Sequence, residues 1–298
     1  MSKRLFPLFS ASARSLRGFT LVEMVIVIAI TGIIAAIVAV FIRAPVQGYV
    51  DTVSRAELAD EADTAVRRMS RDLRLALPNS IRVSNVGNDV YLEFLLTRTG
   101  GRYLAEEDGV LNGDILSFTD ASDRVFRVVG PLATGAQQIV AGDEVVIYNL
   151  GVGQAPANAY DCSVSCNRAE VASANSTART ITLTNNPFAL QVPTMRSPGN
   201  RFQVVSTPVT YACNLAVGTL TRFDRYGIQA AQPLNANAAP LSGAANGLLA
   251  TNVTGCAFNY ATLANVRSAL VGITLSMRRD ASSGEVTLFH QLHVDNTP

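Results

Sequence analysis

The sequence lacks the residue patterns that accompany enzymatic catalysis. It contains no G-x-S-x-G nucleophile turn, no H-E-x-x-H zinc motif and no glycine-rich phosphate loop. Charged residues are also scarce, at 16% of the 298 residues, whereas 48% are hydrophobic. A chain this apolar buries enough side chains to fold, as one large domain or two small ones. We therefore expect a folded protein that is not an enzyme.

Acidic residues are missing from the first 18 positions. This leader carries four basic residues, Lys3, Arg4, Arg14 and Arg17, and the rest of the chain has 20 basic and 23 acidic residues. A nucleic-acid-binding domain needs lysines and arginines clustered on one face, and the weakly acidic remainder has no such excess. Nucleic acid is therefore not expected as a partner.

Charge is almost absent from residues 19–42, an apolar run whose only charged side chain is Glu23. As a helix this run is about 36 Å long, which is enough to cross a bilayer core of about 30 Å. The basic leader places the N-terminus in the cytoplasm and the body in the periplasm. A cleaved secretory signal is the alternative, but the run is longer than a usual signal core and ends without an A-x-A site.

A second helical pattern follows Pro45. Apolar residues recur three and four positions apart with charged residues between them, which predicts an amphipathic helix over residues 46–78 that is ended by Pro78. Pro45 removes one backbone hydrogen bond and predicts a kink or a break between the two helical stretches. Together they would form one long N-terminal helix, half in lipid and half packed on a soluble domain.

Short β-rich runs separated by Gly, Asn, Asp and Pro fill the chain after Pro78, and they predict an antiparallel sheet. The expected strands are residues 89–96, 114–119, 124–129, 144–150, 180–184, 202–205, 209–213, 219–223, 256–260, 270–277 and 285–294. Two stretches, 151–179 and 230–247, are predicted to be long surface loops. The expected class is α+β, with the long helix packed on the sheet.

Four cysteines follow the apolar run: Cys162, Cys166, Cys213 and Cys256. An even number of cysteines in an oxidising compartment predicts disulfides. A zinc site built from four thiolates usually has two close pairs, and only Cys162 and Cys166 are close. Three pairings are possible. We favour Cys162 with Cys166 and Cys213 with Cys256, because the last two lie in strand-like runs that could be neighbours.

Several polar residues suggest other sites only weakly. His290 and His293 stand three apart in an expected strand, so they point to opposite faces and no metal or other cofactor is predicted. Five acidic residues could form a calcium site but lack the calcium-loop pattern, and they are predicted to be solvated turn residues: Glu106, Glu107, Asp108, Asp143 and Glu144. Four arginines of the second helix are predicted to form a solvated face: Arg67, Arg68, Arg71 and Arg74.

The segment G-F-T-L-V-E at residues 18–23, with the basic leader before it and the apolar run after it, resembles the N-terminus of a type IV prepilin or pseudopilin. The resemblance covers about residues 14–45 and implies a type IV pilin-like fold. It implies that a prepilin peptidase cuts between Gly18 and Phe19 and methylates the new amino group of Phe19. The implied partners are that peptidase, other pilin subunits, and the inner membrane before assembly.

The cut would place a new α-amine near the carboxylate of Glu23. In a filament core made of packed helices, the amine of one subunit and the carboxylate of its neighbour can neutralise each other. A wrong register would leave a buried charge unpaired, at a cost of several kcal/mol. Glu23 is therefore predicted to act in assembly. The simpler interpretation is that Glu23 lies near the cytoplasmic interface, where a carboxylate is tolerated.

The later part of the chain resembles the O-type minor pilins of MSHA pili, which are similar to J-type pseudopilins of type II secretion. The resemblance rests on residues 144–150, 211–213, 218–220 and 290–296. It implies a minor pilin that joins or primes a filament outside the cell. Its parts would be a leader (1–18), a transmembrane or filament-core helix (19–45), an amphipathic helix (46–78) and a periplasmic β-rich body (79–298). The alternatives are a type II secretion pseudopilin and a membrane-anchored binding or adhesin domain that never polymerises.

Overall fold

A computed structural model describes residues 18–109, 113–163, 166–260, 268–280 and 283–298. The chain divides into two units, Met1–Val53 and Ser54–Pro298. One helix, α1 (Leu21–Leu73), begins in the first unit and ends in the second. Twelve strands follow it among the described residues, and all of them are paired antiparallel. The predicted α+β class, a long N-terminal helix followed by an antiparallel β domain, is confirmed.

The two predicted helical stretches form a single element. α1 continues through Pro45, so the predicted break is not observed. Losing one N–H costs a single hydrogen bond, which the intact ladder on either side can absorb in so long a helix. The helix ends at Leu73 and not at Pro78. The chain leaves the helix early because Leu77 N donates to Leu95 O and Thr97 N donates to Leu75 O, which joins this turn to a strand.

The strands form two sheets. Nine belong to the larger sheet: β1 (Arg82–Val86), β2 (Asp89–Tyr103), β3 (Val125–Val129), β4 (Glu144–Val146), β5 (Arg168–Asn175), β6 (Thr180–Leu183), β7 (Arg201–Asn214), β8 (Thr219–Asp224) and β9 (Ala245–Ala250). The smaller sheet has three: β10 (Val253–Tyr260), β11 (Ser268–Met277) and β12 (Val286–Asp295). Short 3-10 helices lie at Glu106–Asp108, Gly135–Gln137, Pro187–Leu190 and Leu241–Gly243.

Some predicted elements were wrong. Residues 114–119 are not a strand, although Leu116 and Phe118 are buried. β1, β5 and β9 were not predicted, and β5 lies inside the expected loop 151–179 while β9 begins inside 230–247. The runs 202–205 and 209–213 belong to one strand, β7. Local propensity misses such strands because their pairing partners supply the stabilisation.

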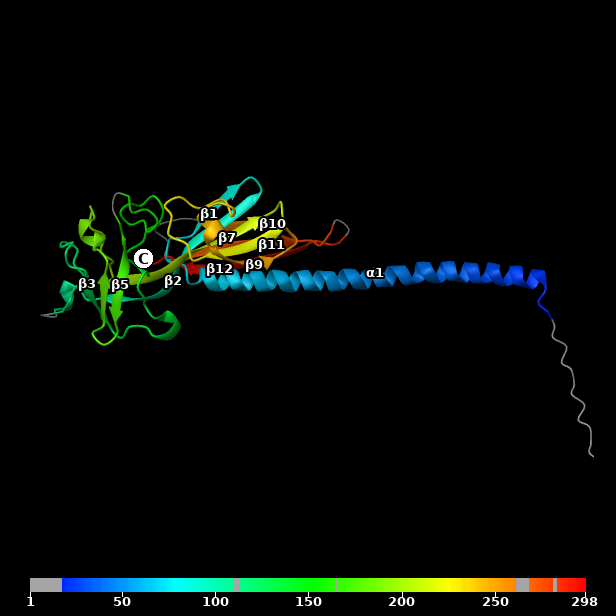
Figure 1. Ribbon diagram of the computed structural model, residues 1–298, viewed down its shortest axis with the longest axis horizontal. Helices are drawn as coiled ribbons and strands as arrows, with labels where there is room; N and C mark the ends of the chain where they lie inside the picture. Colours follow the sequence, from blue (N-terminus) through cyan, green and yellow to red (C-terminus); the bar gives the residue numbers. More distant parts are fainter. Residues whose placement is uncertain (1–17, 110–112, 164–165, 261–267, 281–282) are drawn as a thin grey trace, which may run out of the picture. The chain divides into compact units, whose positions relative to one another are not determined.

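The end of the large sheet that contains the last residues of β2 and the first residues of β7 closes into a small barrel. The strand order β2, β3, β6, β5, β4, β7 returns to β2, since β7 also pairs directly with β2 from Arg102↔Arg201 onward. Figure 1 shows β3 and β5 at this end of the body. Phe126 and Phe202 meet edge to face in its interior, with ring centroids 5.5 Å apart. The barrel thus has its own core, separate from the core around α1.

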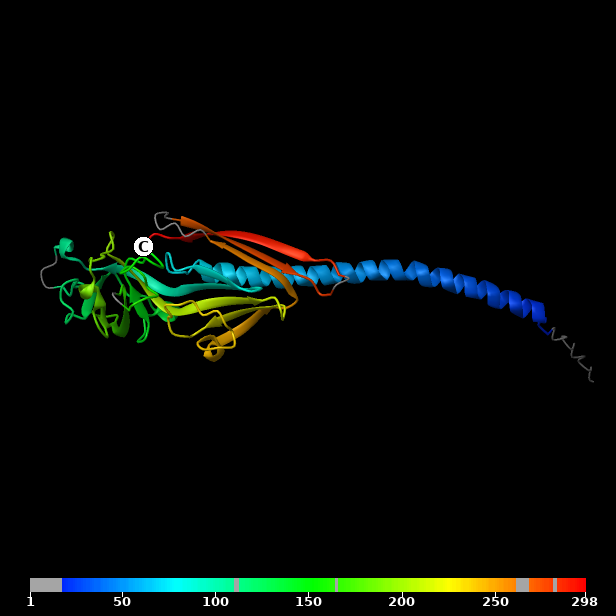
Figure 2. The ribbon, with the colours of Figure 1, turned by 90° about the horizontal axis from the view of Figure 1, so that it is seen from above.

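The other half of β2 and β7, with β1, β8 and β9, packs on residues 54–73 of α1. The small sheet β10–β12 packs on the same core, and Figure 2 shows its strands beside the helix. The buried apolar positions of this part of the helix are Leu58, Ala62, Ala65, Val66, Met69 and Leu73. This spacing of three and four confirms the amphipathic pattern seen in the sequence.

Candidate functional site

The start of α1 is capped by Thr20. The backbone N–H of Glu23 donates to the Thr20 hydroxyl at 3.2 Å, the geometry of a helix N-cap. Glu23 is exposed in the first turn. A carboxylate at this place is also stabilised by the positive end of the helix dipole. Gly18 and Phe19 precede the helix and are exposed, Phe19 to 78%. The Gly18–Phe19 bond therefore lies outside regular structure. Thr20 was not among the predicted site residues, although T-x-x-E at residues 20–23 is the capping-box pattern.

The described part of the first unit consists mainly of the apolar start of α1, and its described side chains are exposed. Within the described residues, α1 is the one helix long and apolar enough to cross a membrane. Its large apolar side chains from Leu21 to Val53 are all exposed in the isolated chain. Such a surface is stable only in lipid or against other apolar helices.

A buried carboxylate, Glu93 on β2, organises the outer side of the large sheet. Arg82 Nε donates to Glu93 Oε2 at 2.5 Å, and the Tyr226 hydroxyl donates to Oε1 at 2.9 Å. The Arg82 guanidinium also lies 3.7 Å from the centre of the Tyr160 ring. Burial raises the pKa of Glu93, while Arg82 and Tyr226 act in the opposite direction. The network fixes two long connections, the one holding Tyr160 and the one holding Tyr226, to the sheet.

A second buried carboxylate, Asp72, anchors the end of α1. It accepts hydrogen bonds from Arg222 Nε at 2.6 Å and from the Tyr211 hydroxyl at 2.9 Å. Arg68 lies 3.5 Å away on the solvent side. Burial and the nearby Asp72 carboxylate raise the pKa of Tyr211, so its hydroxyl remains a donor. This contact fixes the helix end to β7 and β8.

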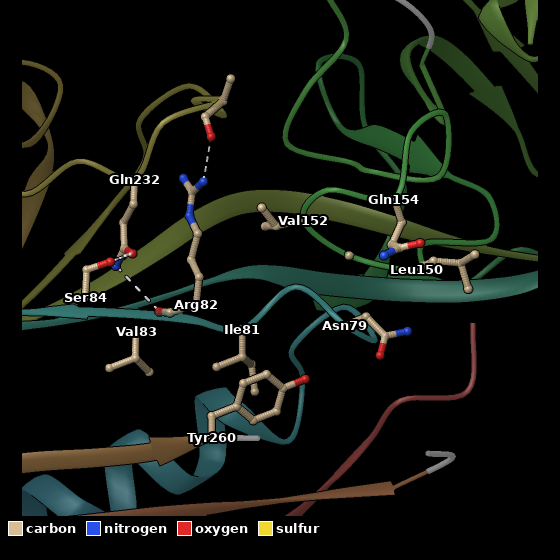
Figure 3. A pocket seen from close by; sticks show the side chains of 12 residues that line it. Asn79, Ile81, Arg82, Val83, Ser84, Leu150, Val152, Gln154, Gln232 and Tyr260 are labelled. Atoms are coloured by element: carbon tan, nitrogen blue, oxygen red, sulfur yellow. Dashed lines mark hydrogen bonds between the residues drawn. The ribbon is translucent and has the colours of Figure 1, made fainter. Parts of the chain in front are cut away.

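One hollow, which we call the junction cleft, has a volume of about 680 Å³ and lies where β1 meets two loops (Figure 3). Most of its polar side chains are hydrogen-bonded to other parts of the protein. Asn79 Nδ2 donates to the carbonyls of Asn149 and Asn296, and Gln232 contacts Ser84 at 2.7 Å. Arg82 reaches across to the Ala230 carbonyl at 2.8 Å. The cleft is therefore a seam that holds the β1 segment, the loops and the C-terminal strand together.

Residues 14–39 match the prokaryotic N-terminal methylation motif. No curated protein and no solved structure matches the chain. This methylation motif is a type IV pilin-like prepilin signal, and it supports membership of the pilin and pseudopilin family. It also implies processing by a prepilin peptidase and assembly with other pilins. The motif and the apolar start of α1 fit a pilin anchored in the inner membrane.

The methylation motif contains the three residues singled out for processing and assembly, Gly18, Phe19 and Glu23. The rest of the predicted leader, residues 1–17, lies outside the described residues. These three residues belong to the first unit, and the cysteines belong to the second. The candidate site is thus a linear segment of the chain, and its motif implies that a prepilin peptidase processes it.

Both disulfides lie in the β domain, which follows the methylation motif in the sequence. Cys213 of β7 is bonded to Cys256 of β10, with the Cα atoms 6.5 Å apart, and this bridge joins the large sheet to the small one. Cys213 is fully buried in the core around α1. Cys162 is bonded to Cys166, with the Cα atoms 4.5 Å apart, next to Arg168 at the start of β5.

The weaker candidates are structural residues. Asp143 and Glu144 were predicted to be solvated, but Asp143 is 3% exposed and pairs with Arg98 at 3.0 Å, and Glu144 pairs with Arg168 at 2.6 Å. The prediction was wrong because both lie in or beside β4, which the barrel buries. Two of the other acidic candidates also have partners within the protein. Asp108 pairs with Arg102, and Glu107 accepts a hydrogen bond from Asn200.

The histidines and helix arginines lie much as their patterns indicate. β12 holds His290 half-buried and His293 exposed. Within the described residues, no three metal-binding side chains of His, Cys, Asp or Glu come together. Arg67, Arg68 and Arg71 are exposed on α1, and Arg74 is exposed in the turn that follows it. Arg67 pairs with Asp63, and Arg68 pairs with Asp72.

Proposed function

We propose that this chain is a minor pilin of an MSHA-like type IV pilus, which joins or primes the filament. The observation that carries the proposal is the methylation motif at residues 14–39, which runs directly into a helix that continues to Leu73. In this proposal residues 1–18 are removed, and residues 19–45 lie in the inner membrane and then in the filament core. The rest of the helix and its turn, residues 46–78, carry the body, residues 79–298, into the periplasm and then outside the cell.

The role of Glu23 in this proposal follows from its position. Removing the leader creates an amine at Phe19, only four residues before Glu23. Within a dry helix bundle an unpaired carboxylate is expensive, so pairing with the amine of a neighbouring subunit favours one axial register. The Thr20 cap keeps the first turn formed, so that the carboxylate has a defined starting point.

The first test is the state of the N-terminus. The full chain is expressed in its host, extracted from membranes and from sheared filaments, and analysed by intact mass and N-terminal peptide mass spectrometry. We expect a mature chain that begins with methylated Phe19. A host lacking its prepilin peptidase, or the variant Gly18→Leu, should retain the leader. An intact leader in the wild type would refute the pilin proposal and favour the anchored binding domain.

The second test concerns assembly. Glu23→Ala should still insert and be cleaved but should be strongly depleted from sheared filaments, because its amine partner would remain unpaired. Thr254→Ala, an exposed change in the β domain, is the control and should be incorporated normally. Wild-type incorporation of Glu23→Ala would contradict the pairing argument.

The third test separates the two machines. Periplasmic crosslinking followed by purification of the full chain and mass spectrometry identifies its neighbours. We expect subunits of a surface pilus. Subunits of a type II secretion apparatus would show that the chain is a pseudopilin.

A further inference from the structure

A second hollow lies on the outer face of β7, β8 and β9, and we call it the outer cleft. Its volume is about 460 Å³. The floor contains the buried side chains of Ala212 and Phe223, and Leu241 of the short helix Leu241–Gly243 closes one side. Strand alternation places Arg222 on the opposite face, where it binds Asp72, so the cleft faces away from α1.

Most polar side chains that line the outer cleft have no hydrogen-bond partner among the described residues. Five of them make no side-chain hydrogen bond to the described part of the chain: Thr219, Thr221, Asn237, Ser242 and Asn246. Asn214 accepts one bond, from Val217 N, and its amide N–H groups remain available. The junction cleft differs, because Asn79, Arg82 and Gln232 are bonded within the protein. The larger hollow is thus a structural seam, and the smaller one offers unused hydrogen-bonding capacity.

The lining also limits the chemistry of an occupant. No charged side chain is among the described residues that line the outer cleft. Hydroxyl and amide groups both donate and accept, and here they surround an apolar floor. The floor residues Ala212 and Phe223 lie on β7 and β8, which are paired on both sides, so the floor itself offers no open backbone edge to an added peptide strand. On this floor the occupant is therefore recognised by side chains.

We propose that the outer cleft binds a neutral saccharide. The hydroxyls of a sugar ring donate and accept as the Thr, Ser and Asn side chains do, and its C–H face can lie against Phe223 and Ala212. A volume of about 460 Å³ is within the usual range for small-ligand sites. The inference does not depend on the proposed pilin role, because the cleft lies wholly within Ser54–Pro298.

The experiment uses the full chain in micelles of a detergent without a sugar headgroup. The protein is applied to an array of neutral hexose and N-acetylhexosamine oligosaccharides, with sialylated and sulfated glycans and uncharged peptides as comparators. The best neutral oligosaccharide is then titrated by calorimetry. We expect binding to neutral glycans in preference to charged glycans and peptides.

Variants locate the binding. Thr221→Val keeps the shape of the side chain and removes its hydroxyl, and Asn246→Ala removes an exposed amide. Each should weaken binding about 5-fold, the usual effect of one hydrogen bond, and the double variant about 25-fold. Thr274→Val is the matched control, since Thr274 is also half-buried on a strand and makes no side-chain hydrogen bond to the described residues. It should leave the affinity unchanged.

Each contrary result overturns the proposal. Absence of any neutral glycan signal, or binding of charged glycans only, shows that the ligand class is wrong. Uncharged peptides binding in place of glycans shows the same. An affinity that Thr221→Val and Asn246→Ala do not change, with circular dichroism showing both variants folded, places the binding outside this cleft.

Discussion

Removing the Cys213–Cys256 disulfide should destabilise the body far more than removing Cys162–Cys166. The first bridge joins residues 43 apart in sequence, and the second joins residues 4 apart. A crosslink mainly restricts the unfolded chain, and the loss of loop entropy grows with the logarithm of loop length. The relation gives about 4 kcal/mol for the long loop and about 2 kcal/mol for the short one at 25 °C.

Burial should widen this difference. Cys213 is fully buried between α1 and the sheets, so Cys213→Ala with Cys256→Ala also removes packed sulfur atoms. Cys162 is exposed, and Cys162→Ala with Cys166→Ala therefore loses little packing. The two double variants are a matched pair, because each replaces one disulfide with two alanines.

The assay is urea unfolding of the full chain in micelles, followed by near-ultraviolet circular dichroism of the tyrosines, since the chain has no tryptophan. With a urea dependence of about 3 kcal/mol per molar, the midpoint should fall by about 1.3 M for the long bridge and about 0.7 M for the short one. Reductant opens both bridges, so it should lower the wild-type midpoint by about 2 M, the sum of the two shifts. Equal shifts for the two variants, or a larger shift for Cys162 and Cys166, would refute the reasoning.

Three further outcomes are expected in the same unfolding assay. Glu93→Leu leaves Arg82 as a buried charge without its carboxylate and should cost about 3–5 kcal/mol, whereas adding Arg82→Met should recover most of the loss. Burial raises the pKa of Glu93, so its contribution to stability is present below the ordinary carboxyl pKa and lost as pH rises through the native value. The stability of Glu93→Gln relative to wild type should therefore rise with pH across that window. Gly101→Ala places a Cβ 2.9 Å from the Phe202 ring and should cost about 1–3 kcal/mol, whereas Gly247→Ala, which meets nothing within 4 Å, should cost little.

The helix and most of the strands were predictable because their side chains repeat with a clear period. The apolar positions from Leu58 to Leu73 recur every three or four residues, and all face the core. β7 was divided in the prediction because Pro208 interrupts it. In the structure Pro208 pairs with Leu95 beside an irregular register at Leu96 and Thr97, where a ladder tolerates proline.

The barrel and the buried ion pairs were not predictable from local pattern. Closure depends on pairs distant in sequence, such as Arg102↔Arg201, that no short window contains. β5 is rich in alanine and polar residues and has the composition of a loop until β4 and β6 flank it. Glu93 alternates with apolar neighbours and so looks solvent-facing, but the connection holding Tyr226 covers that face.

The continuity of β2 and β7 explains how the body carries a second core. The chain between Tyr103 and Arg201 forms most of the barrel, and it enters and leaves through two strands hydrogen-bonded to each other along their length. Gly100 and Gly101 let these strands approach closely at the transition, where a Cβ would meet Gln203 and Phe202. The barrel is thus held by a ladder and not by a flexible linker. A subunit built this way would hold the outer cleft and the barrel in fixed positions relative to residues 54–73 of α1, the part of the helix that the body packs on.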